Sequence, residues 1–295
     1  MSAMVNVNGR LADSEHAVIS VFDHGFLYGE GVYEVLRTYD GEPFLFERHM
    51  RRLRASASMI RLDVPLTDAE FDTRIRETMT AAGLGQDGSE AYIRVLLTRG
   101  IGEISYDPTA CPSPSIVIIT KPHVEAPASA YADGVMVSLV GIVRNHPGSV
   151  SPLIKSNNLL NNALGNQEAL RQGAFEGVMR NYRGEIAECT TSNIFIVKNG
   201  EAVTPPLDAG LLAGITREFL FEVAAAIGIP TREQVMHDHD VLGADEAFLT
   251  STTREIVPIV RVDRHIIGTG RPGTTTLKLL EGFRARTRAH APQQV

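Results

Sequence analysis

The stretch GEIAECTTSNIFIV, residues 184–197, joins two predicted antiparallel hairpins. One hairpin covers residues 174–188 and the other residues 192–206, because RNYRG and VKNG are turn signals between apolar segments. Glu188 stands at the end of a strand with apolar positions on both sides. A carboxylate there needs a cationic partner or a hydrogen bond. Taken alone, the stretch favours an ion pair with one of the chain's arginines.

Upstream of these hairpins, VSPLIKSNNLLNNALGNQEAL at residues 150–170 places a lysine just before an apolar-periodic helix. The chain has 24 arginines and only four lysines, so the choice of Lys155 is unusual. Burial lowers the pKa of a lysine, in extreme cases by about 3–5 units. The neutral amine can then attack a carbonyl and form a Schiff base. A solvated lysine is the commoner case, so the neighbouring motifs carry the argument.

Two further segments have the character of phosphate-binding turns. LLAGITREFLF at 211–221 begins a helix at Gly214, Ile215 and Thr216, where free N–H groups and the helix dipole attract an anion. FLTSTTREIVP at 248–258 adds hydroxyl and N–H donors in a turn between strands. A lysine, a carboxylate and two such turns in this order favour pyridoxal phosphate. The carboxylate would keep the ring nitrogen protonated and make the ring an electron sink.

These residues resemble the class IV (fold type IV) pyridoxal-phosphate aminotransferases, a family of branched-chain aminotransferases, D-amino-acid aminotransferases and aminodeoxychorismate lyases. The most specific match is ECTTSNIF at 188–195, then Thr204, then LAGITR at 212–217. The likeness extends from VISVFDHGFLYGEGVYEVLR at 18–37 to the C-terminal helix. It implies an α/β fold with a small N-terminal domain (1–121) and a larger, barrel-like cofactor-binding domain (133–295). The segment 122–132 between them is expected as a linker, because it is rich in Pro, Ala and Ser and has no strong period. The resemblance also implies a homodimer.

The resemblance implies a role for each matching residue. Lys155 resembles the catalytic Schiff-base lysine, Glu188 the partner of the ring nitrogen, and Arg52 in ERHMRRLRASA the arginine that binds the phosphate. Without the resemblance, Arg52 is one more charge on an amphipathic helix. Other cofactor contacts are implied at Leu212, Gly214, Ile215, Thr216, Ser251 and Thr252. The implied reaction is ping-pong transamination, in which an amino acid leaves as a keto acid and a second keto acid takes the amino group.

The predicted substrate is a branched-chain L-amino acid, with 2-oxoglutarate as the acceptor. Tyr92 and Arg94 in SEAYIRVLL are two apart on a strand and so share a face. This spacing resembles the carboxylate-binding pair of branched-chain aminotransferases. The D-specific enzymes use Arg-x-His in the next loop, which here reads TRGIGEISYDP and has no histidine. Tyr33, Arg37 and Thr253 complete the predicted substrate-binding set.

Alternatives within the same family remain open. The segments YEVLR at 33–37 and LTSTTREI at 249–256 are closer to the D-specific pattern. Leu159 stands where branched-chain enzymes tend to have a tyrosine near the cofactor's phenolic oxygen. A D-amino-acid or (R)-amine transaminase is therefore one alternative. An aminodeoxychorismate lyase, which would use the same lysine and cofactor, is another.

The composition limits the other function classes. With 295 residues, the chain is long for one core and natural for two domains. A net charge of −7 argues against nucleic acid or an anionic membrane as a partner. No signal peptide or membrane-spanning run is evident, so we expect a cytoplasmic protein. VMHDHDVLGADE at 235–246 lacks a third ligand at fixed spacing, so no metal is predicted, and YGEGVYE at 28–34 is a weak dinucleotide motif.

The pattern of the first part predicts its elements. VNVNGRL at 5–11 and HAVISVFD at 16–23 are expected as strands. Helices are expected over 46–60, where apolar residues recur at helical spacing, and over 67–83, where Thr67 and Glu70 have capping-box spacing. Two further strands are expected at 89–100 and 113–122.

Overall fold

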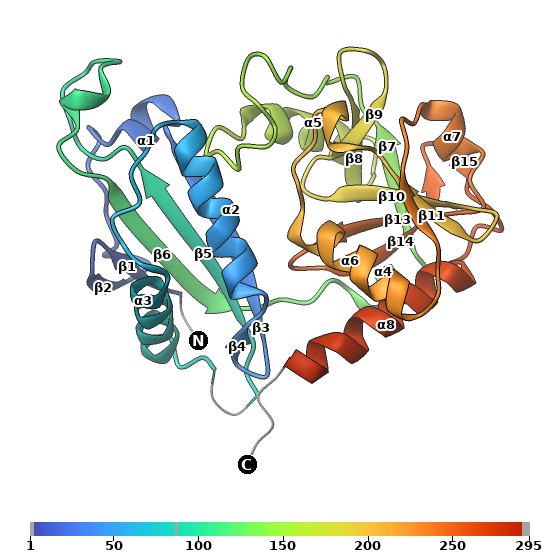
Figure 1. Ribbon diagram of the computed structural model, residues 1–295, viewed down its shortest axis with the longest axis horizontal. Helices are drawn as coiled ribbons and strands as arrows, with labels where there is room; N and C mark the ends of the chain where they lie inside the picture. The colour runs from blue at the N-terminus through green and yellow to red at the C-terminus, as the bar shows by residue number, and fades with distance from the viewer. Residues whose placement is uncertain (1–2, 86–87, 291–295) are drawn as a thin grey trace. The chain divides into compact units, whose positions relative to one another are not determined.

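The computed structural model describes residues 3–85 and 88–290, with the side chains of the last two left out, and divides into two compact units (Figure 1). The first unit comprises Met1–Val124, Ile154–Asn158 and Arg288–Val295, and the second comprises Glu125–Leu153 and Leu159–Thr287. The division at 124/125 falls inside the segment 122–132 expected as a linker. That segment also contains a short helix, α4 (Ala128–Ala132). The segment that carries Lys155 returns to the first unit.

The first unit is built on a six-stranded sheet with the order β2-β1-β6-β5-β3-β4 within the described residues. Its strands are β1 (Met4–Val7), β2 (Arg10–Asp13), β3 (Gly31–Tyr39), β4 (Glu42–Pro43), β5 (Ala91–Thr98) and β6 (Ser115–Pro122). Its helices are α1 (His24–Tyr28), α2 (Phe46–Met59), α3 (Asp68–Ala81) and the 3₁₀ turn η1 (Pro108–Ala110). Helix α2 lies along the sheet in Figure 1, and its apolar side packs into the core of this unit.

Local sequence explains both long helices of the first unit. The capping box predicted for α3 is confirmed, because Thr67 Oγ1 accepts from the Glu70 N–H and the Glu70 carboxylate accepts from the Thr67 N–H. In α2, Met50 and Leu53 are fully buried and recur at helical spacing. The strand β3 contributes Val32 and Leu36 to the same core, as its period of two requires.

The second unit is built on a nine-stranded sheet that curls into a half-barrel, with the order β12-β11-β10-β13-β14-β7-β8-β9 and β15 paired to β14. Its strands are β7 (Val135–Leu139), β8 (Glu176–Arg180), β9 (Ile186–Cys189), β10 (Asn193–Lys198), β11 (Glu201–Thr204), β12 (Thr231–Glu233), β13 (Glu246–Ser251), β14 (Glu255–Val262) and β15 (His265–Ile266). The remaining elements are α5 (Leu160–Arg171), η2 (Leu207–Ala209), α6 (Ile215–Ala226), α7 (Asp238–Leu242) and α8 (Thr274–His290). The mixed α/β fold predicted from the sequence is confirmed.

Two predicted elements are wrong. Residues 5–11, expected as one strand, form the hairpin of β1 and β2 with a turn at Asn8 and Gly9. Residues 16–23 form no strand: the chain runs through a turn, an irregular stretch and an isolated bridge between Asp23 and Ile101. Val18, Ile19, Val21 and Phe22 are 49–75% exposed, so neither face of a strand here would be buried. The apolar pattern resembles a strand, but such a pattern does not specify a pairing partner.

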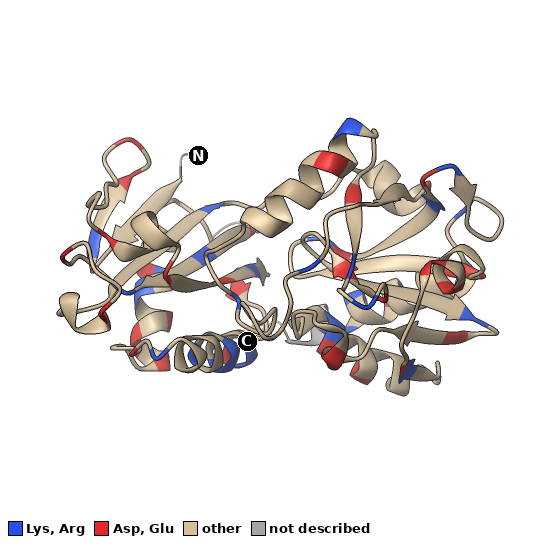
Figure 2. Ribbon diagram, turned by 90° about the horizontal axis from the view of Figure 1, so that it is seen from above, with Lys and Arg blue, Asp and Glu red and all other residues tan. Residues whose placement is uncertain are grey.

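Charged residues of both signs are interspersed along the elements of both units (Figure 2). Among the described residues, no helix is long and apolar enough to cross a membrane.

Candidate active site

Lys155 is held against the start of β3 by backbone hydrogen bonds. The Tyr33 N–H donates to the Lys155 carbonyl at 2.9 Å, and the Asn157 N–H donates to the Gly31 carbonyl at 2.9 Å. A Cβ at Gly31 would lie 2.6 Å from Asn157 Nδ2, so a glycine is needed for this approach. The YGEGVYE motif therefore has a structural explanation: its second glycine admits the segment that carries the lysine.

The lysine amine lies beside two of the predicted substrate residues. Lys155 Nζ is 4.6 Å from the centroid of the Tyr33 ring, and the Arg94 guanidinium carbon is 4.2 Å from the same centroid. In the β3–β5 register, Arg94 is opposite Val35 and Tyr92 is opposite Arg37. All four predicted substrate residues of this unit therefore share one face of its sheet.

Arg37 and Tyr92, the other two predicted substrate residues on this face, have different neighbours. Arg37 is buried, and its guanidinium carbon lies 4.2 Å from the centroid of the Tyr39 ring. Lys121 Nζ lies 5.0 Å from the centroid of the Tyr92 ring. The sheet thus gathers three cations among tyrosine rings on the face next to Lys155, an arrangement suited to an anionic ligand.

Arg52 projects from α2 to a fully buried carboxylate. Its Nε and Nη2 donate to Glu34 Oε1 and Oε2 at 2.7 and 2.8 Å, and His49 Nδ1 is 2.7 Å from Oε2. Burial alone would raise the pKa of Glu34, but the charges and hydrogen bonds of Arg52 and His49 lower it to about 2. Burial lowers the pKa of His49. Because an ionised carboxylate can only accept, the His49 Nδ1–H donates to Glu34.

In the second unit, Glu188 lies in β9, one residue before its end, and is 5% exposed. Its Oε1 accepts from Arg144 Nε at 2.7 Å, so the arginine ion pair that the sequence favoured is present. Its Oε2 accepts from the Leu212 N–H at 3.0 Å and from Asn193 Nδ2 at 3.4 Å. A carboxylate offers about four acceptor positions, so these three donors leave Glu188 able to accept from one more N–H.

The helix α6 begins beside this carboxylate. A Cβ at its N-cap residue, Gly214, would lie 1.9 Å from Asn193 Oδ1, which explains the glycine. Asn193 Nδ2 also donates to the Leu212 carbonyl at 3.0 Å, so this one asparagine holds the segment from Leu212 to Gly214 that leads into α6. Within the described chain, no side chain caps this end of α6, and Ile215 and Thr216 are nearly buried. The N–H groups of this first turn are oriented for an anion.

The second predicted phosphate turn, Ser251 to Arg254, connects β13 and β14. Arg254 closes it, because its N–H donates to the Ser251 carbonyl at 3.3 Å and its Nε donates to Ser251 Oγ at 3.2 Å. Ser251, Thr252 and Thr253 are partly exposed, as ligand-binding hydroxyls must be. The predicted cofactor and substrate residues thus fall into two sets, one in each unit.

A family profile described as "Amino-transferase class IV" matches residues 31–262 of this chain, which include both sets. The chain belongs to the class IV aminotransferases. The matched range contains Lys155, Glu188 and both predicted phosphate turns.

Named relatives of this aminotransferase fall into two substrate groups. A Methanocaldococcus jannaschii protein, provisionally named a branched-chain-amino-acid aminotransferase, is 38% identical over 280 residues, which cover 95% of each chain. The D-alanine aminotransferase of Staphylococcus haemolyticus is 32% identical over 281 residues, or 95% of this chain and 96% of that one. Sequence similarity therefore identifies the reaction class, while the relatives' names give different substrates for those proteins.

Solved structures share the aminotransferase's fold. The Escherichia coli branched-chain amino acid aminotransferase has a TM-score of 0.91 and 32% identity, covering 97% of this chain and 94% of that one. The T.th. branched-chain amino acid aminotransferase, solved with pyridoxamine 5′-phosphate, has a TM-score of 0.91 and 25% identity, covering 99% and 96%.

Sequence reasoning missed several residues that hold the predicted ones. Glu34 had a detectable signal, because it stands at a core-facing position of β3, between Val32 and Leu36. An acidic residue at such a position requires a cation. Arg144 had no comparable signal, because it meets Glu188 across 44 positions of chain.

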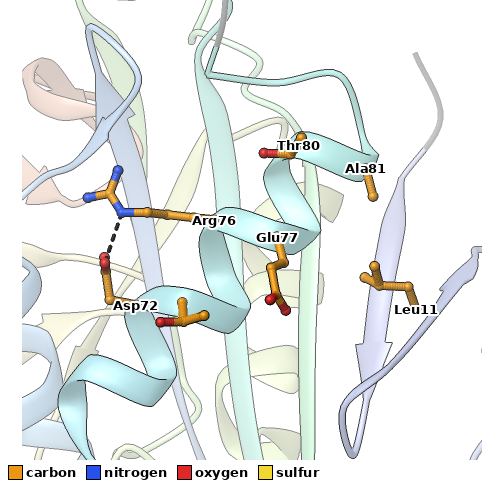
Figure 3. A pocket seen from close by; sticks show the side chains of 7 residues that line it. Leu11, Asp72, Arg76, Glu77, Thr80 and Ala81 are labelled. Carbon is orange, nitrogen blue, oxygen red and sulfur yellow. Dashed lines mark hydrogen bonds and ion pairs between the residues drawn. The ribbon is translucent and has the colours of Figure 1, made fainter.

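The described residues also line a hollow in the first unit. This hollow beside α3, lined by Leu11 and the helix from Asp72 to Ala81, contains none of the predicted residues, and its Arg76 is paired with Asp72 at 2.9 Å (Figure 3). No group of three or more His, Cys, Asp or Glu in the described residues could hold a metal ion.

Proposed function

We propose that this aminotransferase binds pyridoxal 5′-phosphate through Lys155 and moves the amino group of a branched-chain L-amino acid to 2-oxoglutarate. The observation that carries the proposal is the arrangement of Lys155 Nζ and Arg94 about the Tyr33 ring, at 4.6 and 4.2 Å from its centroid. An amine able to bind an aldehyde lies here on the same sheet face as a cation suited to a substrate carboxylate.

The donor sets of the chain fit the cofactor. When bound, pyridoxal phosphate supplies a ring that withdraws electrons from the substrate's α-carbon. In the proposal, Glu188 accepts the hydrogen bond of the ring nitrogen, for which it retains an acceptor position. Arg144 Nε, 2.7 Å from Glu188 Oε1, places a positive charge beside that carboxylate. Arg52, the first turn of α6, Ser251 and Thr252 are the residues proposed to bind the phosphate. Leu212 and Gly214 shape the segment that leads into α6.

Lys155 has two roles in the proposed reaction. Its amine would hold the cofactor through the aldehyde until an amino acid takes that place. The released Nζ then accepts the α-proton of the substrate as a general base and later returns a proton. An arginine at this position would stay protonated and could do neither. Reaction with a second keto acid reverses the sequence of proton transfers.

The side chains on the sheet face favour an L-amino acid. Arg94 and Tyr92 are proposed to bind the α-carboxylate, with Tyr33, Arg37 and Thr253 bordering the substrate. The arginine of the next loop, Arg99, is committed elsewhere: its Nε donates to Glu30 at 2.7 Å and its Nη groups donate to the Ile60 and Arg61 carbonyls at 2.7 Å. It lacks the histidine two residues on that the D-specific pattern has.

A D-amino-acid substrate is the second candidate, supported by the YEVLR and LTSTTREI segments and by the D-alanine aminotransferase relatives. A lyase reaction would need the same lysine but no amino acceptor. Both alternatives keep the proposed cofactor and change the identity of the substrate or the fate of the amino group.

The proposed active form is a homodimer. Val18, Val21 and Phe26 are 62–75% exposed, and Ile104 and Tyr106 are 71% and 90% exposed. The segments that carry them are joined by the Asp23–Ile101 bridge and by a 2.9 Å hydrogen bond from the His24 N–H to the Gly100 carbonyl. Such an apolar patch is expected to be covered by a second copy. Light scattering should find a dimer, and Phe26→Glu should weaken it; a monomer for the unchanged chain would contradict this.

Two experiments test the function. Borohydride reduction of the purified, cofactor-loaded protein should fix the cofactor on the peptide that contains Lys155. A label on another peptide, or no binding after reconstitution, overturns the cofactor assignment. The loaded protein is then mixed separately with L-leucine, D-alanine and (R)-phenylethylamine, and the cofactor absorbance is followed. A fast change with L-leucine is expected, and glutamate should form when 2-oxoglutarate is added; a fast change with D-alanine alone overturns the substrate assignment.

A further inference from the structure

We propose that Glu176 and Arg254 are a positioning pair that fixes the turn Ser251–Arg254 and so sets the protein's affinity for the cofactor's phosphate. The inference rests on the proposed binding of pyridoxal phosphate. Neither residue is among those that the sequence motifs assign to the cofactor. Both belong to the second unit, so the argument needs contacts within that unit alone.

Glu176 is a carboxylate enclosed in the sheet. It begins β8, and its side chain is 1% exposed. Its Oε2 lies 2.9 Å from Arg254 Nη2. That oxygen has no well-aligned hydrogen bond within the described chain, so the guanidinium charge is what compensates its burial. The position of Arg254 is therefore tied to a group that cannot move without exposing an uncompensated charge.

The same carboxylate also holds a second turn, the one between β9 and β10. Glu176 Oε1 accepts from Thr191 Oγ1 at 3.0 Å, from the Thr191 N–H through a shorter contact, and from Thr190 Oγ1 at 3.4 Å. Arg254 Nη2 donates to Thr191 Oγ1 at 2.7 Å. The Thr191 hydroxyl thus donates to the carboxylate and accepts from the guanidinium, which closes a network between the two turns.

The network ends on a residue proposed to contact the phosphate. Arg254 Nε donates to Ser251 Oγ at 3.2 Å. Because that oxygen accepts from the guanidinium, its own O–H must point to a different acceptor. A phosphate oxygen beside the turn is an acceptor of the right kind. Fixing the hydroxyl beforehand reduces the entropy lost when the ligand binds.

The test separates phosphate recognition from general stability. Dissociation constants are measured spectroscopically for pyridoxal phosphate and for pyridoxal, which has the same aldehyde and no phosphate. Glu176→Gln should weaken the binding of pyridoxal phosphate about 10- to 100-fold, the range seen when a residue that orients a metal ligand is removed. Pyridoxal should bind with little change. A purely structural role would weaken both ligands together.

A second variant and a control keep the test decisive. Arg254→Lys retains a cation for Glu176 but loses the planar fork that reaches both turns, so it should show the same selective loss even if Glu176→Gln folds poorly. Asp238→Asn removes the carboxylate 2.6 Å from Arg180, at the other end of β8, and should leave both constants unchanged. Equal losses for the two ligands, or no loss in either variant, would overturn the inference. Failure of the unchanged protein to bind either ligand would instead overturn the proposed function, and this inference with it.

Discussion

Glu34 and Arg52 form a two-pronged ion pair across the first unit, with Nε–Oε1 and Nη2–Oε2 distances of 2.7 and 2.8 Å. The carboxylate is fully buried on β3, and the guanidinium, on α2, is 10% exposed. Such a pair fixes the plane of the arginine as well as its place. If Arg52 binds a phosphate, Glu34 determines the direction from which it does so.

Because of this pair, the free energy of unfolding should depend on pH in the range set by the pKa of Glu34. The pKa of Glu34 is about 2 in the folded chain, against 4.5 as its ordinary value. Its contribution is complete above about pH 4.5 and is lost as the pH falls toward 2, because the unfolded chain then binds the extra proton. The difference corresponds to about 3 kcal/mol at most. Urea unfolding at several pH values should therefore show a shallower acid loss for Glu34→Gln than for the unchanged chain; equal slopes would contradict the pairing.

The contact between Gly31 and the lysine segment gives a second prediction. In Gly31→Ala, the new Cβ would lie 2.6 Å from Asn157 Nδ2 and 2.7 Å from the Leu97 carbonyl. The segment 154–158 must then move, at a cost of about 1–3 kcal/mol. We expect lower thermal stability together with weaker covalent binding of pyridoxal phosphate. Gly141→Ala, whose Cβ would be 3.5 Å from its nearest neighbour, is the control and should change neither quantity.

The contact at Gly31 could not be predicted from the sequence, whereas several local features could. The capping box of α3 and the two hairpins of residues 174–206 were predictable, because each depends on residues close together in the chain. The return of Lys155 to the first unit was not, because it depends on an approach to β3 across more than 120 residues. The failed strand at 16–23 has the same origin, since an apolar alternation does not specify a pairing partner.

Arg94 offers a prediction about substrate binding. Arg94→Gln should raise KM for the amino acid about 10- to 100-fold, because a charged hydrogen bond to a carboxylate contributes about 1.5–3 kcal/mol. Cofactor affinity should stay unchanged, since Arg94 lies over the Tyr33 ring and is not among the proposed phosphate residues. Lys121→Gln removes another cation from the same sheet face and serves as the control. Equal KM increases in both variants would indicate a general charge effect rather than a specific contact.

Arg99 gives the prediction that best separates L from D substrates. Its guanidinium is 9% exposed and donates to Glu30 and to the Ile60 and Arg61 carbonyls, so it holds the start of the following loop against the end of α2. If that is its role, Arg99→Met should lower the free energy of unfolding by about 3 kcal/mol at most, because three acceptors lose a hydrogen bond that contributes about 1 kcal/mol each. The ratio of kcat/KM for L-leucine to that for D-alanine should not change beyond about twofold, since neither substrate carboxylate depends on this side chain. A selective collapse of activity toward D-alanine, in a variant that still binds cofactor and remains folded, would show that Arg99 leaves its three acceptors to bind substrate, and would favour the D-specific assignment.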